Sequence, residues 1–163
     1  MRYIEIPGKK LITLNIWDTE GKEKNNTLNE NIYKNVKAVI LVYDTTNPQS
    51  FSELKNYWFK QVEQHCDRDV IKAIAANKCD LCLYDEIYDF ESEDFAQRKG
   101  DFFSYTSAKN DSGITYLFEK IAMKILDPDF DLTDMLRTGI ERIENRKVKK
   151  NGITNNKKDN SKN

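Results

Sequence analysis

Hydrophobic and polar positions alternate in two short segments near the start of the chain, and longer apolar runs follow. Residues 2–6 and 11–17 have the two-residue period of half-buried strands. The stretch "IPGKK" between them is typical of a hairpin turn, so we expect this pair of strands to be antiparallel. Three further β-rich runs predict strands at residues 37–43, 70–77 and 102–106.

A helical pattern follows each of the last three predicted strands. The first begins at Ser50, which we expect to cap the helix while Glu53 completes a capping box. The second spans residues 92–99 with Ser92 as its candidate cap, and the third spans residues 113–126. Strands that alternate with helices imply parallel crossovers. The predicted fold is therefore α/β, with three layers and a mostly parallel sheet that has one antiparallel edge strand.

The composition excludes several classes of protein. The chain has 163 residues, 39% of them apolar, which is enough to bury a core. Apolar runs such as "AVILVY" are too short to cross a bilayer, and the first residues lack a signal-peptide pattern. We therefore predict a cytoplasmic protein with no transmembrane segment. The net charge of −1 gives no electrostatic reason to expect nucleic acid as a partner.

The pattern weakens near the C-terminus, which divides the chain into a predicted domain at residues 1–130 and an extension at residues 131–163. An apolar stripe predicts one more helix as far as about residue 148, and the remainder is a basic tail rich in Asn and Lys that we expect to be disordered. Residues 137–163 contain nine basic and three acidic residues. Two interpretations stay open for this segment, a solvated tail and weak peripheral contact with a membrane.

Three cysteines and a histidine raise the question of a metal site. His65 and Cys66 precede the C-x-x-C pair formed by Cys79 and Cys82, a set of ligand types that suits zinc. The strand predicted at residues 70–77 separates the two pairs by roughly 26 Å, at about 3.3 Å per residue. Thiols without a metal are therefore the favoured interpretation.

Two polar motifs follow neighbouring strands, at the edge of the sheet where ligands of α/β proteins bind. In "NKCD", Asp80 can accept hydrogen bonds from the ring N–H and the exocyclic amine of guanine together, Asn77 can order the loop, and the stem of Lys78 can cover one face of the base. In "TSAK", Ala108 can offer a backbone N–H to the guanine carbonyl, and Lys109 can pack on the other face. The two motifs together predict a guanine site.

Further motifs in the same order point to a family. The stretches "WDTEG" at residues 17–21, "AVILVYDTTNPQSF", "NKCDL" and "YTSAKN" resemble those of the Ras-like small GTPases, and of the Rab branch most closely. The resemblance implies a GTP-binding switch in vesicle trafficking that takes GTP or GDP with Mg²⁺. Asp18 would hold Mg²⁺ through water, and the N–H of Gly21 would meet the γ-phosphate. The implied guanine-binding residues are Asn77, Lys78, Asp80, Ser107, Ala108 and Lys109.

The sequence departs from this family in its phosphate-binding parts. No G-x-x-x-x-G-K-[ST] motif occurs in the 163 residues. The resemblance implies that such a loop precedes residues 2–6, and that its strand lies between the strands at 11–17 and 37–43. We therefore expect a domain truncated at its N-terminus, with impaired GTP binding and hydrolysis. The alternatives are a degenerate, non-hydrolysing interaction module and a fragment from an incomplete gene model.

The resemblance also implies which functional residues differ. Lys22 occupies the position of the usual water-orienting Gln, and charged lysine cannot accept a hydrogen bond from water, so we expect slow hydrolysis and no intact catalytic residue. Trp17 and Ile32, with Tyr33 beside it, match the interswitch and switch II surface that binds Rab effectors and regulators, although Trp17 is also compatible with packing in the sheet. No cysteine follows Cys82, so we expect no C-terminal prenylation.

Overall fold

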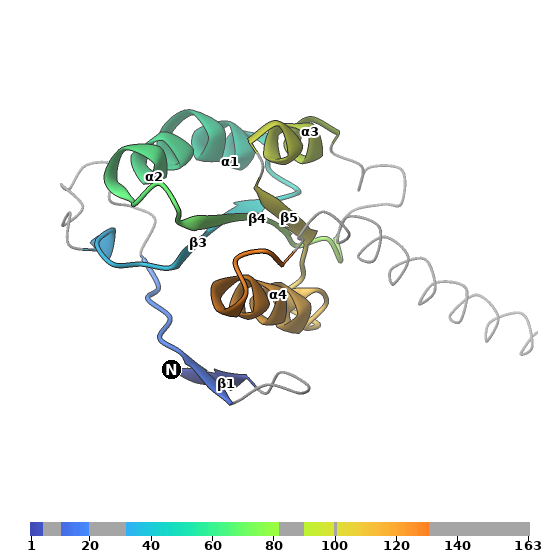
Figure 1. Ribbon diagram of the computed structural model, residues 1–163. Helices are drawn as coiled ribbons and strands as arrows, with labels where there is room; N and C mark the ends of the chain where they lie inside the picture. The colour runs from blue at the N-terminus through green and yellow to red at the C-terminus, as the bar shows by residue number, and fades with distance from the viewer. Residues whose placement is uncertain (5–10, 20–31, 82–89, 100, 131–163) are drawn as a thin grey trace, which may run out of the picture. The chain divides into compact units, whose positions relative to one another are not determined.

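The computed structural model describes residues 1–4, 11–19, 32–81, 90–99 and 101–130 (Figure 1). The strands are β1 (Arg2–Ile4), β2 (Ile12–Leu14), β3 (Ala38–Asp44), β4 (Ile71–Asn77) and β5 (Phe102–Tyr105). The helices are α1 (Pro48–Glu53), the π-helical segment η3 (Leu54–Trp58), α2 (Phe59–His65), α3 (Phe90–Lys99) and α4 (Ile114–Leu126). The predicted extension at residues 131–163 lies outside the described residues.

The strands form one parallel sheet and one antiparallel pair. Strand β1 pairs with β2, with Tyr3 opposite Thr13, while β3, β4 and β5 pair in parallel in that order. Helices α1, α2 and α3 cover one face of the parallel sheet and α4 covers the other (Figure 1). The predicted α/β class with a mostly parallel sheet is confirmed. Within the described ranges the two groups of strands are separate sheets, because β2 and β3 do not pair.

The first helix begins earlier than predicted. Asn47 is its N-cap, and the Asn47 side-chain oxygen accepts a hydrogen bond of 3.1 Å from the N–H of Gln49. Pro48 follows at the first helical position, where its fixed φ suits a helix and its missing N–H costs nothing. The prediction that Ser50 caps this helix was therefore wrong. The Ser50 hydroxyl instead accepts a hydrogen bond of 3.0 Å from the N–H of Asp44.

The second predicted cap was also wrong, and the reason lies in the core. Helix α3 begins at Phe90, so Ser92 lies inside its first turn and is fully buried. The Ser92 hydroxyl is 2.7 Å from the hydroxyl of Tyr43 on β3. A buried hydroxyl needs a hydrogen-bond partner, and Tyr43 provides one from across the layer.

Aromatic side chains fill the layer between the parallel sheet and helices α1 to α3. Phe95 of α3 lies edge to face against Phe51 and Phe59, with ring centroids 6.0 and 5.0 Å apart. The ring of Tyr43 on β3 is tilted against that of Phe51, with centroids 5.1 Å apart. The edge-to-face geometry of the two Phe95 pairs is a favoured arrangement of aromatic rings, and it helps to hold the helices on the sheet.

The opposite face of the sheet is covered by α4, whose N-cap is Gly113. Gly113 has φ +73°, and a Cβ atom there would lie 2.3 Å from the carbonyl oxygen of Tyr105, so only glycine fits. Helix α4 also packs on the hairpin of β1 and β2. The side chains in this cluster are Ile4, Ile12, Leu14, Phe118, Ala122 and Met123. Within the described ranges, no helix is long and apolar enough to span a membrane.

A buried carboxylate lies where α3 joins β5. The N–H of Asp101 donates to the carbonyl of Ala96 at 3.0 Å, and the Asp101 side chain is only 3% exposed. Its Oδ1 atom lies 3.2 Å from Nζ of Lys72, while Oδ2 has no hydrogen-bond partner within the described ranges. Burial raises the pKa of Asp101 to about 6, although the positive charge of Lys72 acts in the opposite direction.

Candidate nucleotide-binding site

The carboxyl ends of β3, β4 and β5 meet at one edge of the parallel sheet, because parallel strands end on the same side. Backbone hydrogen bonds tie the segments that follow these strands to one another. Thr45 donates to the carbonyl of Asn77 through its N–H at 3.0 Å and through its hydroxyl at 2.9 Å. The N–H of Cys79 donates to the carbonyl of Thr106 at 3.1 Å. The loops at this edge are therefore joined before any ligand binds.

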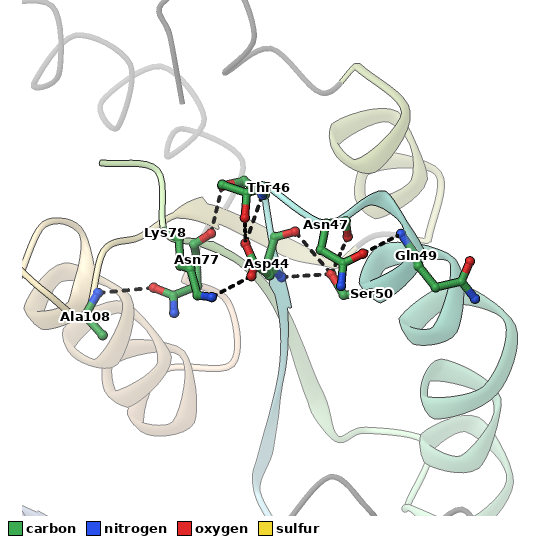
Figure 2. A network of polar contacts seen from close by, with 9 residues as sticks. Asp44, Thr46, Asn47, Gln49, Ser50, Asn77, Lys78 and Ala108 are labelled. Atoms are coloured by element: carbon green, nitrogen blue, oxygen red, sulfur yellow. Dashed lines mark hydrogen bonds and ion pairs between the residues drawn. The ribbon is translucent and has the colours of Figure 1, made fainter. Parts of the chain in front are cut away.

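Asn77 connects the two motifs predicted to bind guanine. Its Oδ1 atom accepts a hydrogen bond of 3.1 Å from the N–H of Ala108 (Figure 2). The Thr106 hydroxyl lies 3.4 Å from the same atom. We predicted that the Ala108 N–H would face the guanine carbonyl, but in this structure it donates to Asn77. A base that used this donor would have to share it with the Asn77 side chain.

A second side-chain contact orients the predicted base-reading carboxylate. The hydroxyl of Ser107, which is fully buried, donates to Oδ1 of Asp80 at 2.5 Å. Asp80 itself is exposed, so a buried group holds one of its oxygen atoms while the residue faces solvent. This arrangement suits a carboxylate that reads a ligand, because the side chain is restrained without being covered.

The segment that contains Lys109 is also held by short-range hydrogen bonds. Ser107 and Ser112 exchange backbone hydrogen bonds of 2.8 and 3.1 Å, and the side chain of Asn110 accepts from the N–H of Ser112 at 3.1 Å. Lys109 lies at the exposed end of this turn. The position is compatible with packing over a base held between the two motifs.

Lys78 adopts a backbone conformation that is unusual for a residue with a side chain. Its φ is +65°, in the left-handed region. Its Nζ atom lies 2.6 Å from Oδ2 of Asp44, and the other oxygen of Asp44 accepts from the N–H of Thr46 at 2.9 Å and from its hydroxyl at 2.6 Å (Figure 2). The hydrogen bonds from Lys78 and Thr46 lower the pKa of Asp44 to about 2.

Asp44 is the residue of this site that sequence reasoning missed. The available signal was its position, because Asp44 ends the apolar run "AVILVY" and begins the polar stretch "DTTNP". The structure brings together Asn77, Lys78, Asp80, Ser107 and Ala108. Gly21 and Lys22 lie outside the described residues.

Asp18 is the residue predicted to hold Mg²⁺ through water. Asp18 is exposed in the segment after β2 and supplies one carboxylate. No group of three or more His, Cys, Asp and Glu side chains able to hold a metal occurs in the described ranges, which include His65, Cys66 and Cys79. The polar groups at the sheet edge, such as the Asp80 carboxylate, can make the hydrogen bonds that a purine base needs.

The predicted effector surface is only partly within the described residues. Trp17 is 82% exposed, which excludes packing of its ring in the sheet. Ile32 is 38% exposed, and the ring of Tyr33 stacks on His65 with centroids 5.4 Å apart. Trp17 is therefore the side chain of this group that is most available to a partner.

The parallel sheet, the helices on its two faces and the polar loops at its edge are consistent with the small-GTPase class of α/β proteins. The model of the Ras family matches residues 1–127, and the chain belongs to that family. It is similar to the Ras-related protein Rab-10 of Caenorhabditis elegans, with 37% identity over 82% of this chain and 66% of the relative. Two human relatives are the Ras-related proteins Rab-22A and Rab-8B. Rab-22A is 40% identical over 72% of this chain and 60% of its own length, and Rab-8B is 37% identical over 77% and 60%.

These comparisons confirm the predicted resemblance to Ras-like GTPases of the Rab type. The chain spans between 60% and 66% of the length of these three relatives. The matched region includes both motifs that meet at the sheet edge.

Proposed function

We propose that this protein is a Rab-like small GTP-binding protein that acts as a guanine-nucleotide-dependent switch in vesicle trafficking. The observation that carries the proposal is the pair of contacts between the two motifs, from Ser107 to Asp80 and from Ala108 to Asn77. Ser107 and Asp80 are 27 positions apart in the sequence and Ala108 and Asn77 are 31 apart, so these contacts join two separate segments at the sheet edge where we propose that the base binds. The similarity to Rab proteins supports the same assignment.

Base selection follows from the hydrogen-bonding pattern of the purine. Guanine presents a ring N–H and an exocyclic amine side by side, and a carboxylate such as that of Asp80 can accept from both. Adenine presents a ring nitrogen that is itself an acceptor, so the same carboxylate would meet a lone pair. The stem of Lys78 and the exposed Lys109 then cover the faces of the base.

The phosphate end of the ligand has fewer contacts in these 163 residues. No phosphate-loop motif is present in the sequence, so the backbone N–H cradle and the lysine that neutralise the phosphates are not supplied by it. We propose that nucleotide affinity of the 163-residue chain depends mainly on the base. With Lys22 in place of a water-orienting Gln, hydrolysis of GTP is slow. Effectors or regulators of the Rab type bind near Trp17, and the protein acts in the cytoplasm.

Binding of guanosine, inosine and GDP to the 163-residue chain, measured by calorimetry with excess Mg²⁺, tests the proposal. Inosine lacks the exocyclic amine, so guanosine should bind more tightly by about five-fold or more, as expected for a lost hydrogen bond to a charged acceptor. Asp80→Asn should remove this preference, because the amide cannot accept from both donors. Asp129→Asn, which changes an exposed acid near the end of α4, is the matched control.

Each unfavourable result has a distinct meaning. Equal affinity for guanosine and inosine in the unmodified chain would refute the guanine site, whereas no measurable binding of guanosine, inosine or GDP would favour the alternative of a degenerate interaction module. Tight, Mg²⁺-dependent binding of GDP, far stronger than that of guanosine, would refute the argument that affinity depends mainly on the base.

A further inference from the structure

Asp44 is the last residue of β3 and is paired with Asn77 at the end of β4, next to the loop that carries the predicted base-reading residues. Its side chain is 24% exposed and that of Lys78 is 51% exposed, so the ion pair between them is at the protein surface but partly shielded. The pair joins residues 34 positions apart in the sequence. It is a tertiary contact across the sheet edge, and no requirement of local chain folding explains it.

The carboxylate of Asp44 is itself held in place from two directions. The N–H and hydroxyl of Thr46 bind one carboxylate oxygen, which leaves the other directed at Lys78 (Figure 2). The backbone N–H of Asp44 donates to the hydroxyl of Ser50 at 3.0 Å. Asp44 is thus a fixed acceptor, and it can order a lysine that would otherwise sample many rotamers.

We propose that Asp44 is a positioning residue of the guanine site, which acts by holding the Lys78 side chain in the conformation that covers the base. This inference rests on the proposed function. A long lysine side chain loses rotamer entropy when it is ordered. Because the Asp44 pair orders Lys78 in the free protein, less of that cost falls on the binding step.

The competing explanation is that Asp44 serves only the local turn. Its bond to the N–H of Thr46, two residues later, is the pattern of an Asx-turn, which stabilises loops without any ligand. The two explanations differ in one measurable respect. A positioning role requires Lys78, whereas a turn role does not.

A double-mutant cycle separates them. Asp44→Asn keeps the size of the side chain and removes its charge, while Lys78→Met keeps an apolar stem and removes the ammonium group. Guanosine affinity and thermal stability are measured by calorimetry for the unmodified chain, both single variants and the double variant. Asp69→Asn, an exposed acid in the segment before β4, is the control for loss of one negative charge.

We expect Asp44→Asn to weaken guanosine binding by about five-fold, the upper range for loss of an ion pair with this exposure. In the Lys78→Met background the same substitution should change affinity less than about two-fold, since the group through which Asp44 acts is gone. Equal weakening in both backgrounds would overturn the inference. So would unchanged affinity in Asp44→Asn with a loss of thermal stability, because that result is the one expected of a turn residue.

A second readout needs no nucleotide. Lys78→Met should raise the pKa of the Asp44 carboxyl, measured by carbon NMR, from about 2 toward its ordinary value of 3.8. An unchanged pKa of Asp44 in Lys78→Met would show that Asp44 and Lys78 do not form an ion pair. That result would overturn the positioning role and leave the proposed guanine site untouched. If the unmodified chain binds guanosine no better than inosine, the proposed function fails and the role of Asp44 fails with it. Preferential binding that Asp44→Asn leaves intact refutes only the positioning role.

Discussion

Replacement of Asp101 by asparagine should change how the stability of this protein depends on pH. The Asp101 side chain is 3% exposed, and it faces Lys72 of β4 together with Glu63 of α2 and Lys99 of α3. Lys99 is also paired with Glu63 at 3.0 Å. Burial raises the pKa of Asp101 from 3.8 to about 6, which means that the fold favours the protonated carboxyl group.

The size and the sign of the change in stability with pH follow from the linkage between proton binding at Asp101 and folding. A carboxyl whose pKa is higher in the folded state binds protons more tightly there, so its stabilising contribution is complete below about pH 4 and is lost as the pH rises through about 6. A rise of about two pKa units corresponds to about 3 kcal/mol at 1.36 kcal/mol per unit. Asparagine does not titrate. The free energy of unfolding of the natural chain, minus that of Asp101→Asn, should therefore fall by up to about 3 kcal/mol between pH 4 and pH 7.

Urea denaturation followed by tryptophan fluorescence, at half-unit intervals across this range, measures the difference. Asp94→Asn provides the control, since Asp94 is 53% exposed and its ion pair with Arg98 contributes at most about 1 kcal/mol. A difference between the natural chain and Asp101→Asn that is constant with pH would refute the argument. A difference that grows as the pH rises would show that attraction to Lys72 outweighs burial.

Three substitutions in the core test the packing, each measured as the free energy of unfolding in urea. Gly113→Ala should cost about 2 kcal/mol or more, because of the positive φ and the contact with Tyr105; a neutral result would contradict that geometry. Tyr43→Phe should cost about 1 kcal/mol through the lost bond to Ser92, and no cost would mean that this bond is unimportant. Phe95→Ala should cost about 3–5 kcal/mol, and less than about 1 kcal/mol would exclude tight packing there.

The order and type of the elements were predictable from sequence, because they depend on local periodicity. The last three strands begin and end within one residue of their predicted bounds. The caps were harder to predict, since both sites offered several polar residues. Asn47 followed by Pro48 is a strong signal for the start of a helix, and the helix begins there and not at Ser50. Ser92 was misassigned because its partner Tyr43 is distant in sequence.

The candidate site was predictable to the extent that its residues follow strand ends. Asp80 and Ala108 were identified from the hydrogen-bonding needs of a base, and the structure places their motifs together. The contact between Asp44 and Lys78 was not predictable, because it depends on the register of β3 against β4, which sets Asp44 beside Asn77. The donation from Ala108 to Asn77 also requires three-dimensional placement.

The hydrogen bonds that join the loops after β3, β4 and β5 have a consequence for how this protein can change. In the part of the chain that the structure describes, the hydrogen bonds given above for this network join residues 44–50, 76–80 and 106–108. None of these hydrogen bonds involves β1, β2 or α4. Mutations that alter the hairpin surface around Trp17 can therefore accumulate, and new partners can be acquired there, while the base-recognition edge keeps its geometry.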